Sequence, residues 1–375
     1  MIEMQNTDYK ICNRCIMDTT DPDIEFDEHG VCNHCKNYEI KVASELIPDE
    51  LKKTQLDEFI DKVKCSGKGR KYDCIVGISG GVDSSYVALL AKDFGLRTLL
   101  VHLDNGWNSD IAVKNVKNIA KNTGFDLYTH VIDWSEFRDL QRSLFAASVV
   151  DIELATDHAI KAVIFKVAAK FGVKYLLNGG NVITEAIMPV TWRHTKVDKS
   201  NLNDIHKKFG KTKLKTYPMA GIIKQQFYKR FYGIENVKIL NYINFVRNDV
   251  INRLVNELEW EEYGGKHHES VFTRFYQGYI LPEKFNIDKR RCHYSNLICA
   301  GQMLRDDALE RMKLSPYDEK MLNSDKEFLI KKLRFTEPEF DEYIKAPRVS
   351  HYDYKSDESL IEFLLGVRKQ LGLDK

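Results

Sequence analysis

The stretch Asp73-Cys-Ile-Val-Gly-Ile-Ser-Gly-Gly-Val-Asp-Ser-Ser85 decides the fold of this chain. It predicts a short apolar strand that runs into a glycine turn, with the residues from Ser79 onward opening a helix. Glycine lets the backbone approach an anion, and the first N–H groups of a helix have no partner inside it. A phosphate bound there also lies at the positive end of the helix dipole. The stretch therefore predicts a phosphate-binding loop, although it lacks the Gly-Lys-Ser/Thr ending of a Walker loop and is not GxGxxG.

Strand and helix signals alternate after this loop. Apolar segments predict four strands, and three segments between them predict helices that end at glycine. The strands are expected at 72–78, 97–103, 127–132 and 173–177, and the helices at 84–94, 110–123 and 157–171. This alternation of strands and helices predicts an α/β fold with a doubly wound parallel sheet. In such sheets ligands bind beyond the carboxyl ends of the strands, so the strand ends at 79–85, 104–107 and 178–181 should share one rim.

The chain has 375 residues, of which 43% are hydrophobic and 30% charged, and its formal net charge is +1. This size and composition are typical of a soluble globular protein with two or three domains. The near-neutral charge gives no sign of a nucleic acid or an anionic membrane surface as partner. The sequence has no apolar run of about 18 residues and no signal-peptide pattern, so we expect a cytoplasmic protein.

Four of the eight cysteines form two closely spaced pairs, Cys12-x-x-Cys15 and Cys32-x-x-Cys35. In a large cytoplasmic protein disulfides are not expected, and clustered thiolates favour a metal. Four thiolates suit tetrahedral zinc and leave no open catalytic position, so the pairs predict a structural zinc ribbon. The alternative is a ribbon that has lost its metal and keeps four free thiols. His34, inside the second pair, could compete as a ligand, but we expect it to face solvent.

These patterns divide the sequence into four parts. They are a zinc ribbon at 1–40, a helical linker at 41–70, an α/β domain with the phosphate-binding loop at 71–192 and a mostly helical substrate- or partner-binding region at 193–375. Between residues 193 and 230, eleven lysine and arginine residues face two aspartates, which gives this stretch a charge of +9. It is either a solvated, partly mobile insertion or a surface that receives an anionic substrate or partner.

In the phosphate-binding loop, backbone amides and hydroxyl groups are expected to hold a pyrophosphate group. The residues expected to do so are Ser79, Gly80, Gly81, Val82, Ser84 and Ser85. Asp83 is an acid in the same loop and would repel a phosphate unless a cation came between them. A magnesium ion that bridges Asp83 and the phosphates would remove this conflict. The alternative is that Asp83 caps the helix.

Two further strand ends carry polar or glycine residues. Asp104 ends the second predicted strand and could bind a ribose or adenine group, or could cap the next helix. Gly179, Gly180 and Asn181 follow the fourth strand. Glycine there allows close approach of a nucleotide, although a tight turn alone would also explain it. Glu185 follows this turn and is a candidate substrate contact.

A second cluster of reactive side chains is Lys266-His267-His268-Glu269, which follows two glycines. Neighbouring side chains on a helix diverge by about 100°, so the two histidines are not expected to ligate one metal. We expect the cluster to be catalytic, contacting substrate and handling protons. The alternative is an ordinary surface loop.

Three arginines further along the chain are candidate substrate contacts, namely Arg274, Arg290 and Arg291. The last two belong to a basic cluster that could meet phosphates or could be an exposed helix end. A glutaminase nucleophile is not evident in the sequence. Position 2 is Ile2, no Gly-x-Cys-x-Gly elbow occurs, and Cys74 lies in a predicted core strand. We therefore expect no glutaminase activity in this chain.

The chain resembles the N-acetyl sugar amidotransferase family (WbpG type) of the PP-loop ATP pyrophosphatase superfamily. The resemblance lies in several motifs and in their order along the sequence. The loop at Ser79 is similar to the SGGxDS loop of the superfamily. The cysteine ribbon at 12–35, Asn178-Gly-Gly-Asn-Val-Ile-Thr-Glu185 and Gly264-Gly-Lys-His-His-Glu-Ser-Val-Phe-Thr273 narrow the resemblance to the family. Arg290-Arg-Cys-His-Tyr-Ser295 follows them, so the resemblance spans nearly the whole chain.

The resemblance implies an enzyme of bacterial surface-glycan synthesis, such as that of the lipopolysaccharide O-antigen. It would convert an acetamido group on a nucleotide-linked or acidic sugar into an acetamidino group. ATP would be split between its α and β phosphates, AMP would be attached to the acetamido oxygen, and ammonia would displace it. The implied cofactors are ATP, Mg²⁺ and a structural Zn²⁺. Partner proteins similar to the glutaminase and cyclase subunits of imidazole glycerol phosphate synthase would supply the ammonia.

Two other readings of the sequence stay open. One is a PP-loop enzyme that modifies tRNA by thiolation or in a lysidine-type ligation, in which the basic stretch at 193–230 contacts RNA. The near-neutral total charge argues against it, and no nucleic acid or membrane partner is expected. The other is a nucleotide-binding scaffold without chemistry, against which the density of polar residues at 263–274 argues.

Overall fold

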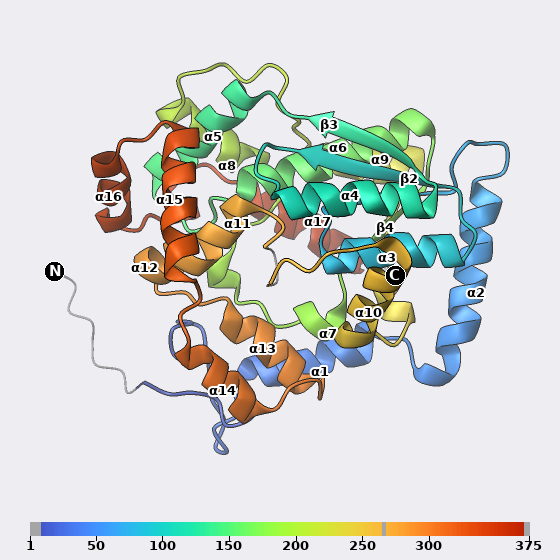
Figure 1. Ribbon diagram of the computed structural model, residues 1–375, viewed down its shortest axis with the longest axis horizontal. Helices are drawn as coiled ribbons and strands as arrows, with labels where there is room; N and C mark the ends of the chain where they lie inside the picture. Colours follow the sequence, from blue (N-terminus) through green and yellow to red (C-terminus); the bar gives the residue numbers. More distant parts are fainter. Residues whose placement is uncertain (1–8, 265–267, 371–375) are drawn as a thin grey trace.

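The computed structural model describes residues 9–264 and 268–370, which contain a five-stranded sheet (Figure 1). The strand order is β3-β2-β1-β4-β5, and every neighbouring pair is parallel. The strands are β1 Cys74–Gly77, β2 Thr98–Asp104, β3 Asp126–Val131, β4 Tyr175–Asn178 and β5 Glu235–Lys238. β1 is central and apolar because helices cover both faces of the sheet. The predicted α/β fold with a doubly wound parallel sheet is confirmed.

The edge strand β5 has no apolar run that would predict it. Its sequence is Glu-Asn-Val-Lys, and all but Val237 are exposed. It forms because its residues pair with Tyr175 to Asn178 of β4, so tertiary pairing supplies what the local sequence lacks. The sheet therefore takes its last strand from beyond residue 192, where the sequence suggests that the α/β domain ends.

Helices cover the two faces of the sheet (Figure 1). One face carries α3 Val82–Asp93, α4 Asp110–Thr123 and α10 Arg247–Leu258, and the other carries α6 Leu154–Phe171 and α9 Ile222–Tyr232. Gly124 and Gly172 end α4 and α6 in the left-handed region, with φ of 73° and 67°. These helices confirm the predicted α/β rhythm. α5, Trp134–Ala147, lies between β3 and α6 and is not among the predicted helices.

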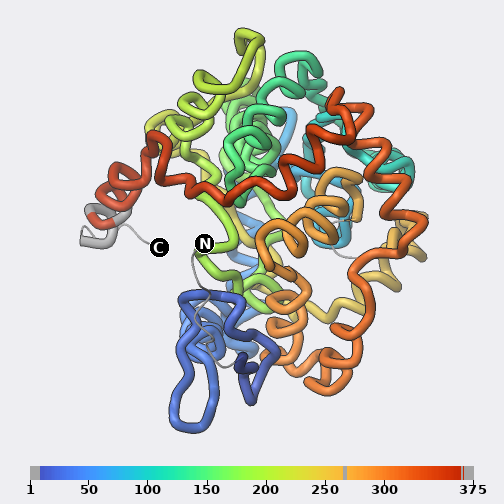
Figure 2. The backbone as a smooth tube through the Cα atoms, turned by 90° about the vertical axis from the view of Figure 1, so that its left-hand side faces the viewer, coloured from blue at the N-terminus to red at the C-terminus, as the bar shows by residue number. Residues whose placement is uncertain are grey.

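The basic stretch at 193–230 is an ordered part of the fold. It contains α8, Lys199–Phe209, and α9; α8 packs on α5 and α6, and α9 packs on α6. Ahead of α8, the ammonium of Lys196 pairs with Asp151 at 2.6 Å and with Asp157 at 2.9 Å. The loop between α8 and α9 lies at the top of both views, opposite the N-terminal ribbon (Figures 1 and 2).

The N-terminal ribbon is held by the bridge pairs Ile11–Asp18 and Phe26–Cys32. The helical segment expected after it consists of two helices, α1 Asn33–Glu45 and α2 Asp49–Ser66. Pro48 separates them, because a proline disfavours helical backbone in the residue before it. Figure 2 shows the ribbon, in dark blue, beside the orange helices of the C-terminal region.

The C-terminal region is mostly helical, as predicted. Its helices are α11 Val271–Phe275, α12 Leu281–Phe285, α13 Arg290–Cys299, α14 Arg305–Lys313, α15 Glu319–Leu333, α16 Glu337–Lys345 and α17 Glu358–Gln370. A π-helical turn, Tyr276–Ile280, joins α11 to α12, and short 3-10 turns lie at Val190–Trp192, Ile239–Tyr242 and His351–Asp353. The largest apolar core packs α11, α12, α13, α15 and α16 against the ribbon and α5. Within the described ranges, no helix is long and apolar enough to cross a membrane.

Candidate active site and zinc centre

The phosphate loop leaves β1 and turns sharply at Gly80, whose φ is +84°. A Cβ atom there would lie 2.6 Å from the backbone oxygen of Ala112 in α4, so only glycine fits. The Gly80 carbonyl accepts hydrogen bonds from Trp260 Nε1 at 2.9 Å and from Asn115 Nδ2 at 3.3 Å. Gly80 therefore fixes the loop against α4 and the segment after α10.

Hydroxyl groups surround the N-terminus of α3, whose N-cap is Gly81. The N–H of Gly81 donates to Ser79 Oγ at 3.2 Å, and the N–H of Val82 donates to the Tyr263 hydroxyl at 3.1 Å. Ser85 is buried and donates to the Gly81 carbonyl at 2.6 Å, so it holds the turn from inside. A phosphate could replace the hydroxyl acceptors at these N–H groups, as expected of an anion site at a helix start.

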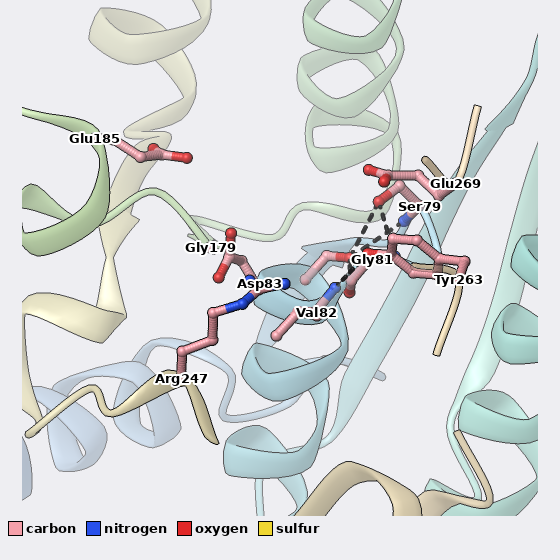
Figure 3. Close-up of a pocket in the computed structure, with 10 residues that line it drawn as sticks. Ser79, Gly81, Val82, Asp83, Gly179, Glu185, Arg247, Tyr263 and Glu269 are labelled. Carbon is pink, nitrogen blue, oxygen red and sulfur yellow. Dashed lines mark hydrogen bonds between the residues drawn. The ribbon is translucent and has the colours of Figure 1, made fainter. Parts of the chain in front are cut away.

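A cavity of about 190 Å³ opens directly on this loop (Figure 3). Its lining residues come from the loop, the end of β4, α7 (Val182–Glu185), the start of α10 and the segment before α11. They are Ser79, Gly81, Val82, Asp83, Ser84, Gly179, Glu185, Arg247, Tyr263 and Glu269. Three carboxylates and one guanidinium therefore face the space next to the phosphate loop. A polyphosphate entering this space would be repelled by the acids unless a cation accompanied it.

Asp83 lies in the first turn of α3, two residues after the N-cap. The N-cap of this helix is Gly81, so the alternative in which Asp83 caps the helix is wrong. A Cβ atom on Gly179 would lie 2.8 Å from Asp83 Cβ, which shows how closely the end of β4 approaches the loop. Arg247 extends toward Asp83 (Figure 3). Oxygen ligands such as Asp83 and Glu185 suit Mg²⁺, so the residues present fit the predicted ion.

Glu269 reaches the loop because residues 269–271 run beside residues 107–109. Asn108 and Ser270 form an antiparallel bridge, the N–H of Ser109 donates to the Glu269 carbonyl, and the N–H of Val271 donates to the Trp107 carbonyl, both at 2.9 Å. A Cβ atom on Gly81 would lie 2.9 Å from Glu269 Oε1. The negative charge of Glu269 adds to burial in raising the pKa of Tyr263.

The other three residues of the predicted catalytic cluster are not among the residues described as lining the cavity. His268 follows the undescribed gap and is partly buried, but the described lining of the cavity does not include it. Lys266 and His267 lie outside the described residues. Of the four predicted residues, the structure therefore brings Glu269 to the loop.

The other predicted ATP contacts divide into two groups. Gly179 and Glu185 line the cavity, whereas Asn181 accepts from the Thr184 N–H at 2.8 Å and caps α7. Asp104 accepts from the Gly106 N–H at 2.9 Å and closes its own turn. The described lining of the cavity contains neither Asp104 nor Asn181, and Gly180 is also outside it. Any contact of these three with ATP stays a prediction.

The three candidate arginines have internal partners. Arg274 pairs with Asp325 at 2.8 Å and Arg290 with Asp288 at 2.7 Å. Arg291 pairs with Asp18 of the ribbon at 2.9 Å and donates to the Ile16 carbonyl. They do not appear among the residues described as lining the cavity, so their role as substrate contacts stays a prediction.

The four ribbon cysteines converge on one point. All are buried, and their sulfurs lie within 4.8 Å of one another. The Sγ atoms of Cys12 and Cys35 are 3.8 Å apart, and those of Cys15 and Cys32 are 3.7 Å apart. A tetrahedron with Zn–S bonds of about 2.3 Å has edges of roughly 3.8 Å, so the sulfurs fit a zinc ion. His34 instead pairs with Asp21 at 2.6 Å and is mostly buried, which corrects its predicted solvent-facing position.

The ribbon that carries the four cysteines also contacts two other parts of the molecule. Arg305 donates to the carbonyls of Cys12 and Cys15 at 2.8 and 3.0 Å, so the start of α14 is hydrogen-bonded to the ribbon on one side. On the other side, Lys41 of α1 donates to the Ala186 carbonyl at 2.6 Å, directly after α7. The ribbon thus connects α7, which carries Glu185, to the C-terminal helices.

Several site residues are not predicted from the sequence. Arg247 begins α10 in a segment without any motif, and Tyr263 stands at the edge of the recognised cluster. His102 in β2 donates from Nδ1 to the Ile78 carbonyl at 2.9 Å. This bond fixes the backbone immediately before Ser79, where the phosphate loop begins. His102 is a polar residue inside an otherwise apolar strand, and this pattern could have marked it as a candidate site residue.

Two families match parts of the chain. Residues 269–368 match the family described as LPS biosynthesis protein WbpG-like, C-terminal domain. Residues 73–173 match Queuosine biosynthesis protein QueC. A comparison with curated proteins gives no match.

A comparison with solved structures matches the chain to NMN synthetase from Francisella tularensis, among others. It has 14% identity and a TM-score of 0.33, and the alignment covers 74% of this chain and 94% of that chain. Another is a predicted subunit of tRNA methyltransferase from Methanocaldococcus jannaschii, with 15% identity and a TM-score of 0.28 over 48% of this chain and 72% of that chain. TM-scores this low support no conclusion about activity.

Proposed function

The chain belongs to a WbpG-type family of PP-loop proteins, which use ATP, and from this premise we propose that it is an N-acetyl sugar amidotransferase. Its substrate would be an N-acetylated sugar, most simply one linked to a nucleotide, and its product the acetamidino sugar. The WbpG name of the matching family supports a place in lipopolysaccharide or other surface-glycan synthesis.

The proposed reaction activates an amide. The acetamido oxygen attacks the α-phosphorus of ATP, the bond to the bridging oxygen breaks, and pyrophosphate leaves. The amide nitrogen loses its proton, so the intermediate is an O-adenylyl imidate. Ammonia adds to the imidate carbon, and AMP leaves with the former acetamido oxygen. Activation is needed because an amide carbonyl resists ammonia and an oxide is a poor leaving group.

Different residues of the cavity can assist different steps of this reaction. The N–H groups of Gly81 and Val82 and the hydroxyls of Ser79 and Ser84 can hold the leaving pyrophosphate. A magnesium ion at Asp83 would offset the charge of the phosphates. Glu269 can accept the proton that the amide nitrogen loses. Closure around the site must exclude water, because water would hydrolyse the imidate.

The observation that carries the proposal is the approach of Glu269 to Gly81. Glu269 is the first residue of the WbpG-like match, and Gly81 lies in the segment that matches QueC. The two family segments therefore meet at one cavity, where a phosphate loop faces a carboxylate. A nucleotide-binding scaffold would not require a carboxylate at this position.

We also propose that separate glutaminase and cyclase-like proteins deliver the ammonia. Cys74, the cysteine nearest to the loop in sequence, is fully buried in β1, and burial raises its pKa to about 12. A thiol in that state is a poor nucleophile. Free ammonium should therefore support turnover by the chain alone, and glutamine should not. Turnover with glutamine and no added protein would contradict this part of the proposal.

The proposal is tested with ATP, MgCl₂, ammonium chloride and UDP-sugars that bear acetamido groups. AMP and pyrophosphate should form in equal amounts only when the correct sugar is present. The sugar product should be lighter by the mass difference between O and NH. Glu269→Gln should lower kcat by about a hundredfold, the size of a general-base contribution. Its control is Glu261→Gln, which removes an exposed carboxylate paired with Lys114. Formation of ADP, or no dependence on any sugar, would contradict the proposal.

The QueC match over residues 73–173 favours one second candidate, an enzyme of tRNA modification. In that case the basic stretch at 193–230 would contact RNA. Transfer RNA should then bind at low ionic strength and dissociate as salt is raised, because phosphate contacts release counterions. Turnover that depends on tRNA and not on sugar would select this candidate.

A further inference from the structure

The outward face of α9 carries a stripe of exposed apolar side chains. Ile223, Phe227 and Phe231 follow one another at intervals of four residues, so they lie on one side of the helix. Their exposed fractions are 69%, 46% and 74%, and Tyr232 beside them is 46% exposed. The rings of Phe227 and Phe231 pack on each other with centroids 4.6 Å apart. Together these four residues are called the α9 stripe.

The α9 stripe is not needed to hold the helix in place. The opposite side of α9 is anchored by Ile222 and Gln225, which are buried, and Gln225 donates to the Ala220 carbonyl at 2.9 Å. Tyr228 stacks on Phe165 of α6, with centroids 6.0 Å apart. Large apolar groups left exposed on an already anchored helix indicate a surface that binds something else.

Positive charges surround the α9 stripe. Lys224, Lys229 and Arg230 are exposed on the same helix. Lys174 also lies close by, since its Cδ is 3.9 Å from where a Cβ on Gly233 would be. The nearest acid in sequence, Glu235, is already paired with Lys62 at 3.6 Å. The net charge of the whole chain is +1, but charges act over only about 8 Å at physiological salt, so this local excess decides what binds here.

We propose that α9 docks the protein on the surface of an anionic phospholipid bilayer. The helix would lie in the plane of the interface, with Ile223, Phe227 and Phe231 among the first carbons of the acyl chains. Its cations would meet the lipid phosphates, and the Tyr232 hydroxyl would stay at the level of the headgroups. This contact concerns the location of the protein and does not depend on the proposed chemistry.

The composition of the surface favours lipid over a protein or an RNA. Lysine is depleted in protein–protein interfaces, whereas a lysine-rich border around exposed apolar groups is typical of interfacial helices. Single-stranded RNA is bound by aromatic faces that stack on bases. The two phenylalanines already pack on each other, and the aliphatic Ile223 cannot stack.

The test is sedimentation of the full-length protein with vesicles. Vesicles of phosphatidylglycerol and phosphatidylcholine should bind it, vesicles of phosphatidylcholine alone should not, and salt should weaken the binding. Phe227→Ser/Phe231→Ser should lower the partition coefficient by about tenfold or more, because binding scales with buried apolar area. Lys224→Gln/Arg230→Gln should lower it while leaving the apolar stripe intact.

The matched control is Leu304→Ser/Leu314→Ser, which removes two apolar side chains that are 72% and 67% exposed at the ends of α14. It should bind vesicles as the wild type does. Phe231→Trp keeps the surface apolar, and its fluorescence should shift to the blue when anionic vesicles are added. Equal loss in the control, no preference for the anionic vesicles, or occupation of the stripe by a second copy, a protein or RNA would overturn the proposal. Ammonia-dependent turnover of a soluble sugar nucleotide should be unchanged in Phe227→Ser/Phe231→Ser, so either proposal can fail alone.

Discussion

The backbone N–H of Val82 donates to the hydroxyl of Tyr263 over 3.1 Å. This bond joins the first turn of α3 to the segment that leads to Glu269. Burial and the negative charge of Glu269 raise the pKa of Tyr263, so its O–H stays protonated and can donate to a phosphate oxygen. The Tyr263 hydroxyl and the backbone of the phosphate loop are therefore placed to contact the same phosphate group.

Tyr263→Phe should weaken ATP binding. A hydrogen bond to a charged group contributes about 1.5–3 kcal/mol, so KM for ATP should rise by about tenfold or more while kcat changes less. Steady-state release of pyrophosphate measures both constants. Tyr128→Phe, on the edge strand β3, is the control and should leave KM unchanged. An unchanged KM in Tyr263→Phe would show that the hydroxyl has no part in binding ATP.

Gly80→Ala should damage both the loop and the stability of the protein. The new methyl group would meet the Ala112 carbonyl oxygen at 2.6 Å in a backbone conformation with φ of +84°. The matched control is Gly95→Ala, where φ is +63° but no described atom lies within 4 Å of the added Cβ. The control should lose about 1 kcal/mol of unfolding free energy from backbone strain alone, and Gly80→Ala clearly more. Urea denaturation compares them, and equal losses would contradict the close approach.

Removal of zinc should loosen the C-terminal helices as well as the ribbon. Arg305 and Arg291 bind carbonyls of the ribbon, so α13 and α14 depend on its shape. Metal analysis should find one zinc per chain, and Cys15→Ser should lose it. Hydrogen exchange should then speed up in α13 and α14. Cys65→Ser, at an exposed cysteine, is the control and should keep the metal. Full zinc content in Cys15→Ser would contradict the assignment.

Acid should destabilise the protein through buried neutral histidines. His351 donates to Asn201 Oδ1 and accepts from the Asp151 N–H, and burial lowers its pKa to about 3. Burial also lowers the pKa of His158, to about 4. The ordinary pKa is about 6.5, so below it the unfolded chain binds protons that the folded chain does not. Stability should therefore fall as pH falls from about 6.5 to 4, by up to about 1.4 kcal/mol per pH unit for each histidine.

This pH dependence is checked by urea denaturation at pH 7.5 and pH 5. The variant His351→Gln removes one of the two groups, so it should lose about 2 kcal/mol less than the wild type between these values. An identical loss in both proteins would mean that His351 already takes up its proton in the folded state.

The parts of the fold that the sequence predicts correctly are those with local causes. Residues close together in the sequence determine these features. They are the apolar strand β1, the glycines that end α4 and α6, and the spacing of the ribbon cysteines. β5 and Arg247 have no such cause, because pairing with β4 and the packing of α10 place them. Such positions depend on contacts between distant segments, which no local pattern records.

The candidate site shows the same division in its charged residues. The loop residues Ser79 and Asp83 lie where their motif predicts. A basic cluster does not reveal that Arg291 pairs with a ribbon aspartate, since Asp18 lies far away in the sequence. The alternative in which Asp83 caps the helix is wrong because the N-cap is Gly81, two residues earlier.

The most direct test of the central claim follows the acetamido oxygen. A sugar substrate labelled with ¹⁸O in its acetamido group is incubated with ATP, magnesium and ammonia, and the AMP is analysed by mass spectrometry. If the amide oxygen attacks the α-phosphorus, one ¹⁸O atom should appear in the phosphate of every AMP formed with acetamidino product. Unlabelled AMP, or label found in pyrophosphate or phosphate, would contradict the account.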